Sequence, residues 1–468
     1  MHRILMVASE AAPFIKTGGL ADVLGSFPAA LVKRGEEVGV VLPRYRNAQI
    51  AGDHRILSDL QLNVGPRRFP VGIDQTVHNG VRYFFVDCPP LYDRAGLYNE
   101  RGYDYIDNDI RFALLSQAAL AVTRYVFPAN ILHAHDWQAG LLAPYLKVNL
   151  ANDPAFFGVK CVITIHNLGY QGNFLNLLSE LGLDPSLYHM DGMEFNRHVS
   201  FLKGGIVWSD AVTAVSPTYA KEIQTPEYGF GFDGLMRSRA YKLTGILNGV
   251  DYNEWSPEND PYISSRYSRP DFLGKLACKK ALLKEFGLAE VSQRPLIGIV
   301  SRFADQKGFG LLGPIAGELA GQNLAFAVLG SGEARDEAMF RSMAAAWPDR
   351  VGLRLGYDEA LAHRIVAGGD MLLMPSRYEP CGLTQMYALR YGTVPIVRAT
   401  GGLEDTVDQE TGFKFQPYTP EALMGAIQEA LGAWQDRAGW VIRMRRGMAK
   451  DYSWDVAAEE YQRVYRSL

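Results

Sequence analysis

Short apolar runs alternate with helical stretches along this chain, and they do so in two separate rounds. In the first half, "RYFFVD", "ILHAHD", "CVITIH" and "AVTAVS" alternate with stretches such as "NDIRFALLSQAALAVTRYV". The segment "ILNGVDYNEWSPENDP", rich in Asn, Asp, Gly and Pro, interrupts the pattern, which starts again at "PLIGIVSRFADQKGFGLLGPIAGEL". Such alternation is typical of parallel sheets covered by helices. The sequence therefore predicts two Rossmann-like, doubly wound α/β domains.

The predicted boundary lies near residue 248, so that residues 1–247 form the first domain and residues 248–468 the second. The last helix, at about 452–468, is expected to pack back on the first domain. Two such domains that face each other leave a deep cleft between the carboxyl ends of their strands, where sheets of this kind bind ligands. Functional residues are therefore expected on the loops that follow strands.

The composition limits the partners and the compartment. A net charge of −4 and a pI near 6.2 argue against nucleic acid or an anionic membrane as the main partner. No apolar run approaches the ~20 residues of a membrane span, and the N-terminal run "ILMVA" is typical of a first strand rather than of a signal peptide. The four cysteines have no C-x-x-C spacing and indicate free thiols and no structural zinc: Cys88, Cys161, Cys278 and Cys381. We expect a cytoplasmic protein.

The stretch "EAAPFIKTGGLADVLGSFPAALVKRG" places Lys16, Gly18 and Gly19 between an apolar strand at residues 4–8 and a helical pattern at residues 20–33. Glycines in such a loop let backbone N–H groups approach an anion at the helix N-terminus. Neither G-x-G-x-x-G nor the P-loop pattern is present, so no dinucleotide or Walker-type site is specified. The alternative is a tight turn with Lys16 as a solvated charge.

A similar loop, "RFADQKGFG", follows the strand "LIGIVS" in the second half and carries Arg302 and Lys307. Two fixed cations beside backbone N–H donors can hold a diphosphate without a metal and neutralise it as it departs. The alternative is a solvated loop with a surface ion pair to Asp305.

The segment "YEPCGLTQMYALRYG" follows another strand. Gly382, Leu383 and Thr384 open a helix whose amides offer a second anion site, and Glu379 just ahead of it can bind sugar hydroxyls or stabilise positive charge. Alternatively, Glu379 only caps the helix. No activating His accompanies Cys381, which favours a buried packing thiol over a nucleophile.

Two motifs of the first half, "HAHDWQAG" and "TIHNLGYQG", end apolar strands with polar and aromatic side chains: Asp136, Trp137, His166 and Asn167. Contact with carbohydrate is the favoured interpretation, because Asp and Asn bond hydroxyls and Trp offers an apolar face. His133 and His135 alternate along a strand, which does not favour a metal site and leaves core histidines as the alternative.

The segment "PPLYDRAGLYNERGYDYIDNDIRF" is expected to be a loop that carries Tyr92, Tyr98, Tyr103 and Tyr105. Tyrosines there suit stacking on sugars, and ordinary loop packing is an equal alternative.

Taken together, "KTGGLADV", "HAHDW", "HNLGYQG", "TPEYGFGFDGL", "ILNGVD", "SRFADQKG", "SRYEPCGLTQMYALRYG" and "ATGGLEDTV" resemble the bacterial glycogen synthases and plant starch synthases. The resemblance covers essentially the whole chain in the same order. It implies a GT-B fold, with two Rossmann-like doubly wound domains and a deep interdomain cleft. It also implies retaining transfer of glucose from ADP-glucose to the non-reducing end of an α-1,4-glucan. The cationic loop and the lack of a convincing cluster of His and carboxylate residues in the sequence lead us to expect no metal or other cofactor.

The resemblance also implies residue roles. On the donor side, Lys16, Arg302 and Lys307 are expected to contact the diphosphate, and Gly18 and Gly19 to line its site. Glu379 faces the glucose, Tyr357 lies along the base and Asn248 reaches the donor. The sugar and phosphate are cradled by Cys381, Gly382, Leu383 and Thr384. On the acceptor side stand Tyr98, Asp136, Trp137, His166 and Asn167. The catalytic set is expected to be Glu379, Lys16, Arg302, Lys307, Asp136 and His166.

One departure bears on the mechanism. Many retaining transferases of this fold carry a second glutamate eight residues after the first, and here that position is Tyr387. A paired-carboxylate scheme is therefore not supported, and a front-face route and a double displacement both stay open. Two rival functions also remain, a transferase of the same fold that glucosylates a small acceptor and a catalytically silent glucan-binding protein. The preference for ADP- or UDP-glucose and the oligomeric state stay open.

Overall fold

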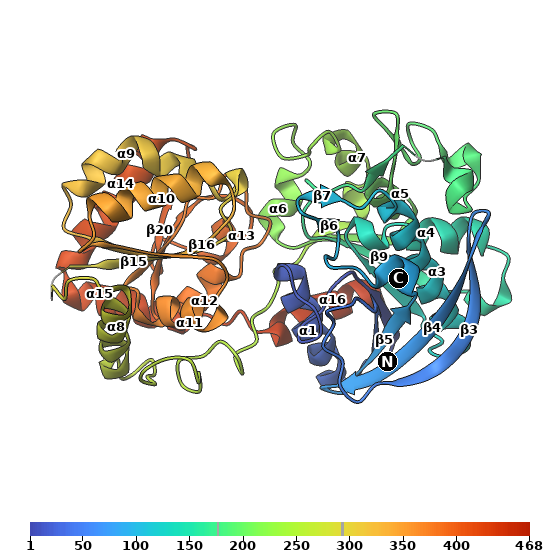
Figure 1. Ribbon diagram of the computed structural model, residues 1–468, viewed down its shortest axis with the longest axis horizontal. Helices are drawn as coiled ribbons and strands as arrows, with labels where there is room; N and C mark the ends of the chain where they lie inside the picture. The colour runs from blue at the N-terminus through green and yellow to red at the C-terminus, as the bar shows by residue number, and fades with distance from the viewer. Residues whose placement is uncertain (176, 292–293) are drawn as a thin grey trace. The chain divides into compact units, whose positions relative to one another are not determined.

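The computed structural model describes residues 1–175, 177–291 and 294–468, and the chain divides into two compact units (Figure 1). The first unit contains Met1–Val215, Ala220–Gly249 and Trp454–Leu468, and the second contains Ser216–Tyr219 and Val250–Ser453. Each unit is built on one main sheet, which confirms the predicted α/β class with two Rossmann-like sheets.

The first unit holds a nine-stranded sheet in the order β14-β13-β9-β8-β1-β2-β5-β4-β3. Its strands are β1 (Arg3–Val7), β2 (Glu37–Pro43), β3 (His54–Val64), β4 (Arg67–His78), β5 (Val81–Asp87), β8 (Ile131–His135), β9 (Lys160–Ile165), β13 (Ala211–Ala214) and β14 (Leu243–Gly245). The strands from β14 to β5 are parallel. The β3–β4 hairpin extends the sheet antiparallel, so this sheet is mixed rather than purely doubly wound.

Helices cover this sheet and bring the two chain ends into one unit. They are α1 (Gly19–Lys33), α2 (Pro89–Tyr92), α3 (Asn108–Tyr125), α4 (Leu142–Pro144), α5 (Phe201–Trp208), α7 (Asp233–Ser238) and α16 (Trp454–Arg466), while α6 (Pro217–Glu222) belongs partly to each unit. Helix α16 lies against α1, where Phe27 stacks on Trp454 at 5.3 Å between ring centroids and meets Tyr461 at 4.4 Å. These rings join the buried core beneath the sheet.

Short strands form two small sheets in the first unit. One consists of β10 (Asn173–Phe174), β11 (Glu194–Phe195) and β12 (His198–Ser200), and the other of β6 (Asn99–Glu100) and β7 (Tyr103–Asp104). The β6–β7 sheet and α2 lie in the tyrosine-rich segment that was predicted to be a loop. Tyr92 is fully buried there and donates to the Arg111 carbonyl at 2.6 Å, so this tyrosine serves packing.

The second unit holds a six-stranded, fully parallel sheet in the order β17-β16-β15-β18-β19-β20. The strands are β15 (Leu296–Val300), β16 (Ala325–Gly330), β17 (Val351–Leu355), β18 (Met371–Met374), β19 (Val394–Arg398) and β20 (Phe413–Phe415). The helices are α8 (Leu273–Phe286), α9 (Leu312–Ala320), α10 (Ala334–Ala346), α11 (Glu359–Gly368), α12 (Thr384–Arg390), α13 (Gly401–Thr406), α14 (Pro420–Gln435) and α15 (Arg437–Met448). Helices α9, α10 and α14 cover one face and α8 and α11 the other (Figure 1), as the alternation predicted.

Each main sheet has one point where the strand order reverses. In the first unit the chain moves outward from β1 through β2 and returns on the other side through β8. In the second unit it moves from β15 through β16 and returns through β18. Parallel sheets bind ligands at the carboxyl ends of the strands beside such a switch point. The loops after β1, β8, β15 and β18 are therefore the places to look for a site.

Candidate active site

Glu10 organises the loop that follows β1. Its buried carboxylate accepts hydrogen bonds from the backbone N–H of Thr17 at 2.5 Å and of Gly18 at 3.2 Å, and from the Tyr98 hydroxyl at 2.9 Å. Burial raises the pKa of this carboxyl. The Glu10 carboxylate thus fixes the loop that contains Lys16, Gly18 and Gly19, because it accepts hydrogen bonds from backbone amides of that loop. Sequence reasoning missed Glu10, although the residue stands directly after the first strand in the loop that was singled out.

Lys16 lies in the loop just before α1 and forms an ion pair, with its Nζ 2.7 Å from the Asp22 carboxylate in the first helical turn. It is therefore a paired group rather than a solitary solvated charge. Gly18 precedes the helix in an extended conformation, and a Cβ built there would meet no atom within 4 Å. The internal packing does not require glycine at this position, and space remains above the loop.

Asp136 follows β8 with a φ of 57° and a ψ of −170°, a backbone conformation that is essentially restricted to glycine and is therefore strained in an aspartate. Its Oδ1 accepts from the backbone N–H of His166 at 2.7 Å and of Asn167 at 3.4 Å, which joins the loops after β8 and β9. Burial raises the pKa of Asp136 to about 7. The switch point of this sheet therefore carries a carboxyl group that titrates near neutral pH.

Two of the histidines predicted at this edge lie side by side. His135 Nδ1 and His166 Nε2 are 3.0 Å apart, and burial lowers the pKa of His166 to about 3 and that of His135 well below its usual value. Both rings are therefore neutral, and one donates to the other. His133, by contrast, bonds Tyr465 at 2.8 Å and Thr164 at 2.6 Å, which makes it a satisfied core histidine.

Trp137 and Asn167 accompany this pair. The half-buried indole packs against Phe112 at 4.9 Å and Phe174 at 5.7 Å between ring centroids. A Cβ at Gly172 would lie 2.5 Å from the same ring, so the last glycine of "HNLGYQG" makes room for the indole. Asn167 accepts from the Gly169 N–H at 3.0 Å and turns the loop. Much of the Trp137 ring is thus engaged by the protein itself.

The raised pKa of Asp136 predicts a pH-dependent stability. Between about pH 4 and pH 7 the unfolded chain releases a proton that the folded protein retains, so this group makes the protein less stable as the pH rises through that window. Asp136→Asn keeps the acceptor oxygen and removes the titration. Urea unfolding across this range should show that the wild type loses stability relative to the variant as the pH rises. A constant difference would contradict the assignment.

In the second unit, the loops after β15 and β18 bring Lys307 and Glu379 together. Glu379 is buried, and its Oε2 accepts from Lys307 Nζ at 2.7 Å and from the Ser376 hydroxyl at 2.9 Å. Asp305 instead pairs with Arg377 at 3.0 Å. Lys307 ends a short helical turn, and the ion pair fixes the glutamate at the switch point of the sheet. Sequence reasoning named Lys307 and Glu379 separately and missed both their pairing and Ser376.

Glycines hold the two loops in close contact. Gly308 has a φ of 74°, and a Cβ there would lie 2.0 Å from the Pro375 carbonyl oxygen. Gly401, at the start of α13, has a φ of 45°, and a Cβ there would lie 1.9 Å from the Glu379 carbonyl oxygen, which also accepts from the Gly402 N–H at 3.1 Å. The pattern "ATGG" thus supports the backbone beneath Glu379.

The residues that open α12 follow Glu379. Cys381 is buried, as the packing interpretation predicted. Gly382 adopts a φ of 72°, and Leu383 and Thr384 are half-buried at the first turn of the helix. Tyr387, at the position of the second glutamate, is buried and stacks on Trp255 at 3.9 Å with an interplanar angle of 3°. That position therefore serves packing.

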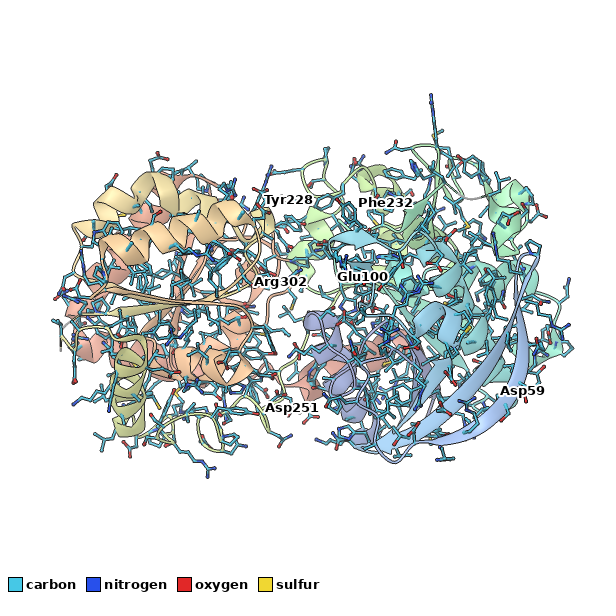
Figure 2. All side chains as sticks on the ribbon, in the orientation of Figure 1. Asp59, Glu100, Tyr228, Phe232, Asp251 and Arg302 are labelled. Atoms are coloured by element: carbon cyan, nitrogen blue, oxygen red, sulfur yellow. The ribbon has the colours of Figure 1, made fainter. Side chains whose placement is uncertain are left out.

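Three further residues were predicted on the donor side, and they come from different parts of the chain. Arg302 follows β15 and is exposed (Figure 2). Tyr357 follows β17, is 76% exposed and donates to Glu359 at 2.8 Å. Asn248 belongs to the first unit and is buried, and its Oδ1 accepts no hydrogen bond from the parts of the chain that the structure describes.

In the described ranges, no helix combines the length and the apolar character that crossing a bilayer requires.

Two family models match the chain, and together they span both units. The starch synthase catalytic domain matches residues 3–238, and the glycosyl transferases group 1 match residues 283–446. The chain is 47% identical to the glycogen synthase of Koribacter versatilis, over 99% of this chain and 98% of that protein. It is 43% identical to the glycogen synthase of Syntrophotalea carbinolica, over 99% of this chain and 98% of that protein.

Solved structures agree with these sequence matches. The catalytic domain of starch synthase IV from Arabidopsis thaliana, bound to ADP and acarbose, superposes with a TM-score of 0.90 and 32% identity and covers 100% of this chain and 99% of its own. Sucrose-phosphate synthase from Thermosynechococcus elongatus shares the fold, with a TM-score of 0.64 and 17% identity over 100% of this chain and 99% of its own. With a GT-B fold, and with this identity over its full length, the chain is a glycosyltransferase that belongs to the glycogen synthase family.

Proposed function

We propose that this protein elongates α-1,4-glucan by retaining transfer of glucose from ADP-glucose to the non-reducing end. The observation that carries the proposal is the ion pair between half-buried Lys307 and buried Glu379 at the switch point of the second sheet, in a chain of the glycogen synthase family. The ADP and acarbose bound to the related starch synthase support a nucleotide and a glucan as ligands. A neutral glucan alone would not require the cations on these loops.

The donor is proposed to bind through loops of both units. Lys16, Arg302 and Lys307 contact the diphosphate, with Gly18 and Gly19 lining its site. The lysine charges and the backbone N–H groups of these loops can stabilise the diphosphate as its charge grows. Further donor contacts are assigned to Asn248, Tyr357, Glu379, Cys381, Gly382, Leu383 and Thr384.

The acceptor glucan is proposed to lie along the first unit, at Tyr98, Asp136, Trp137, His166 and Asn167. Neutral imidazoles suit hydroxyl groups, because each ring offers one donor and one acceptor. The pKa of His166, near 3, keeps that ring neutral at any pH where the enzyme would work.

A front-face route is the proposed mechanism. The bond between the anomeric carbon and the diphosphate oxygen breaks, and its electron pair goes to the departing diphosphate. The acceptor hydroxyl attacks the same face and gives its proton to that leaving oxygen. Glu379, held by Lys307 and Ser376, stabilises the positive charge that develops on the sugar and orients it.

Incubation of the purified protein with glycogen and either ADP-glucose or UDP-glucose tests the function. We expect release of ADP with growth of the glucan. Release of ADP only when free sugars are the acceptors would favour the small-acceptor transferase. Binding of glucan without any turnover of the nucleotide sugar would favour a catalytically silent binding protein. Neither result is compatible with the proposal.

Activity is expected to need no divalent metal, because lysine and arginine side chains supply the positive charge for the diphosphate. Excess chelator should leave the rate of ADP release unchanged. A large loss that magnesium or manganese restores would contradict the assigned role of Lys16, Arg302 and Lys307.

A further inference from the structure

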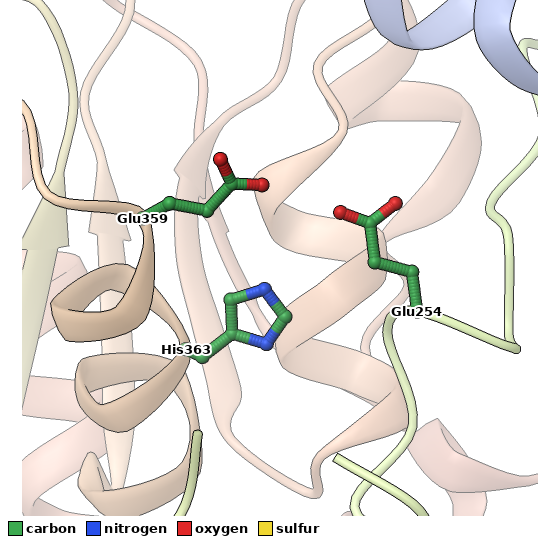
Figure 3. Close-up of side chains that lie close together, drawn as sticks. All are labelled: Glu254, Glu359 and His363. Atoms are coloured by element: carbon green, nitrogen blue, oxygen red, sulfur yellow. The ribbon is translucent and has the colours of Figure 1, made fainter. Parts of the chain in front are cut away.

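Three side chains of the second unit lie together at the start of α11, in a cluster that the proposed reaction does not use. Each of Glu254, Glu359 and His363 offers one potential ligand atom, and these atoms all lie within 4.8 Å of one another. Glu254 comes from the segment before α8, whereas Glu359 and His363 stand four residues apart on one face of α11. Figure 3 shows the two carboxylates facing one another on the same side of the imidazole.

The imidazole of His363 is held in one orientation. Its Nδ1 lies 2.8 Å from Asp260 Oδ2, and the ring stacks on Trp255 at 3.6 Å with an interplanar angle of 16°. A carboxylate accepts only, so Nδ1 carries the proton and donates to Asp260. In the neutral form of an imidazole with its proton on Nδ1, Nε2 holds a lone pair.

That lone pair has no partner in the parts of the chain that the structure describes. The His363 side chain is 0% exposed, and its Nε2 is buried without a hydrogen bond. A buried polar atom in a native protein is nearly always satisfied, so an unsatisfied one requires an explanation. Here Nδ1 is already engaged, and the two carboxylates lie beside the ring. A cation between them would satisfy Nε2 and balance both negative charges.

We propose that Glu254, Glu359 and His363 bind a divalent transition-metal ion, with zinc as the best match. Imidazole nitrogen with carboxylate oxygen is a usual donor set for zinc, whereas calcium and magnesium prefer oxygen alone. A carboxylate that holds the other nitrogen of a ligating histidine, as Asp260 holds His363, is the usual support of such a ligand. Water completes the coordination.

The geometry requires only small movements. Ligand atoms about 2.1 Å from a tetrahedral ion lie roughly 3.4 Å from one another, so the present cluster must contract by about 1.4 Å at most. The imidazole is fixed, and the two glutamates can move because Glu254 is exposed and Glu359 is half-buried. The Tyr357 hydroxyl donates to Glu359 Oε2 at 2.8 Å and already orients that carboxylate beside the site.

Calorimetric titration of the metal-stripped, full-length protein with zinc tests the proposal. We expect one saturable site, which a large excess of magnesium or calcium does not block. Glu254→Gln and Glu359→Gln should each weaken zinc binding by at least about tenfold, because even supporting residues of a metal site contribute about 10- to 100-fold. His363→Gln should abolish binding. His363 is buried, so His363→Gln could fail to fold. In that case the two glutamate variants still test the site.

Glu258→Gln is the matched control, since Glu258 is an exposed glutamate on the same segment as Glu254 and is not part of the cluster. It should bind zinc as the wild type does. Crystals soaked in zinc should show an anomalous peak between His363 Nε2 and the two carboxylates. The proposal is overturned by the absence of a saturable zinc site, by equal binding in Glu254→Gln, Glu359→Gln and the wild type, or by an anomalous peak only elsewhere.

Discussion

Glu379→Gln is expected to lower turnover by about 10²- to 10⁴-fold while ADP-glucose binding stays within a few fold of the wild type. The amide keeps the shape of the side chain and can still accept from Ser376, but it removes the negative charge that Lys307 holds 2.7 Å away. In the proposed mechanism that charge matters most when the sugar becomes cationic, so the loss should fall on kcat rather than on donor affinity. Initial rates with glycogen and calorimetric titration with ADP-glucose measure the two quantities.

Asp305→Asn serves as the matched control. Asp305 lies in the loop of Lys307, but it is exposed and pairs with Arg377, so its loss should change turnover by no more than a few fold. Near-normal turnover of Glu379→Gln would remove Glu379 from the catalytic set. A glucosyl ester trapped on Glu379 or Asp136 and detected by mass spectrometry would replace the front-face route with a double displacement.

The strands at the centre of each sheet were predictable because their sequences are continuously apolar. The run at residues 4–8 corresponds to β1 (Arg3–Val7), and "MLLMPS" contains all of β18 (Met371–Met374). The β3–β4 hairpin was missed because β3 (His54–Val64) is largely exposed, and such edge strands lack the apolar run of a buried strand. Local patterns therefore identify buried strands better than solvated edges.

Candidate site residues could be proposed from the sequence where one motif carries its own chemistry, as at Lys16, Lys307 and Glu379. The missing parts depend on contacts between distant segments. In the sequence Glu10 is an ordinary carboxylate between Ser9 and Ala11, and only the folded loop shows that it accepts hydrogen bonds from Thr17, Gly18 and Tyr98. His363 was likewise invisible, because its significance comes from Asp260 and Glu254, about 100 residues earlier. A site whose side chains come from distant segments of the chain can be recognised only in the folded structure.

Lys307→Met is expected to lower kcat/KM for ADP-glucose by about 10²- to 10³-fold, the loss that follows removal of one stabilising donor in a protected site. Methionine fills the same volume without charge. The change removes a proposed diphosphate contact and also leaves the Glu379 carboxylate without its 2.7 Å partner. Steady-state kinetics with varied ADP-glucose measure the loss, and a thermal melt checks that the buried site stays folded.

The double variant Lys307→Met/Glu379→Gln tests whether Lys307 and Glu379 act in catalysis as one ion pair or as two independent groups. Because the two groups contact each other, their effects should not multiply, and the double variant should lose at most about tenfold more than the worse single variant. Lys16→Met combined with Glu379→Gln is the comparison, because Lys16 pairs with Asp22 rather than with Glu379, and that pair of effects should be close to multiplicative. Multiplicative losses in Lys307→Met/Glu379→Gln would mean that the ion pair does not act as a unit in catalysis.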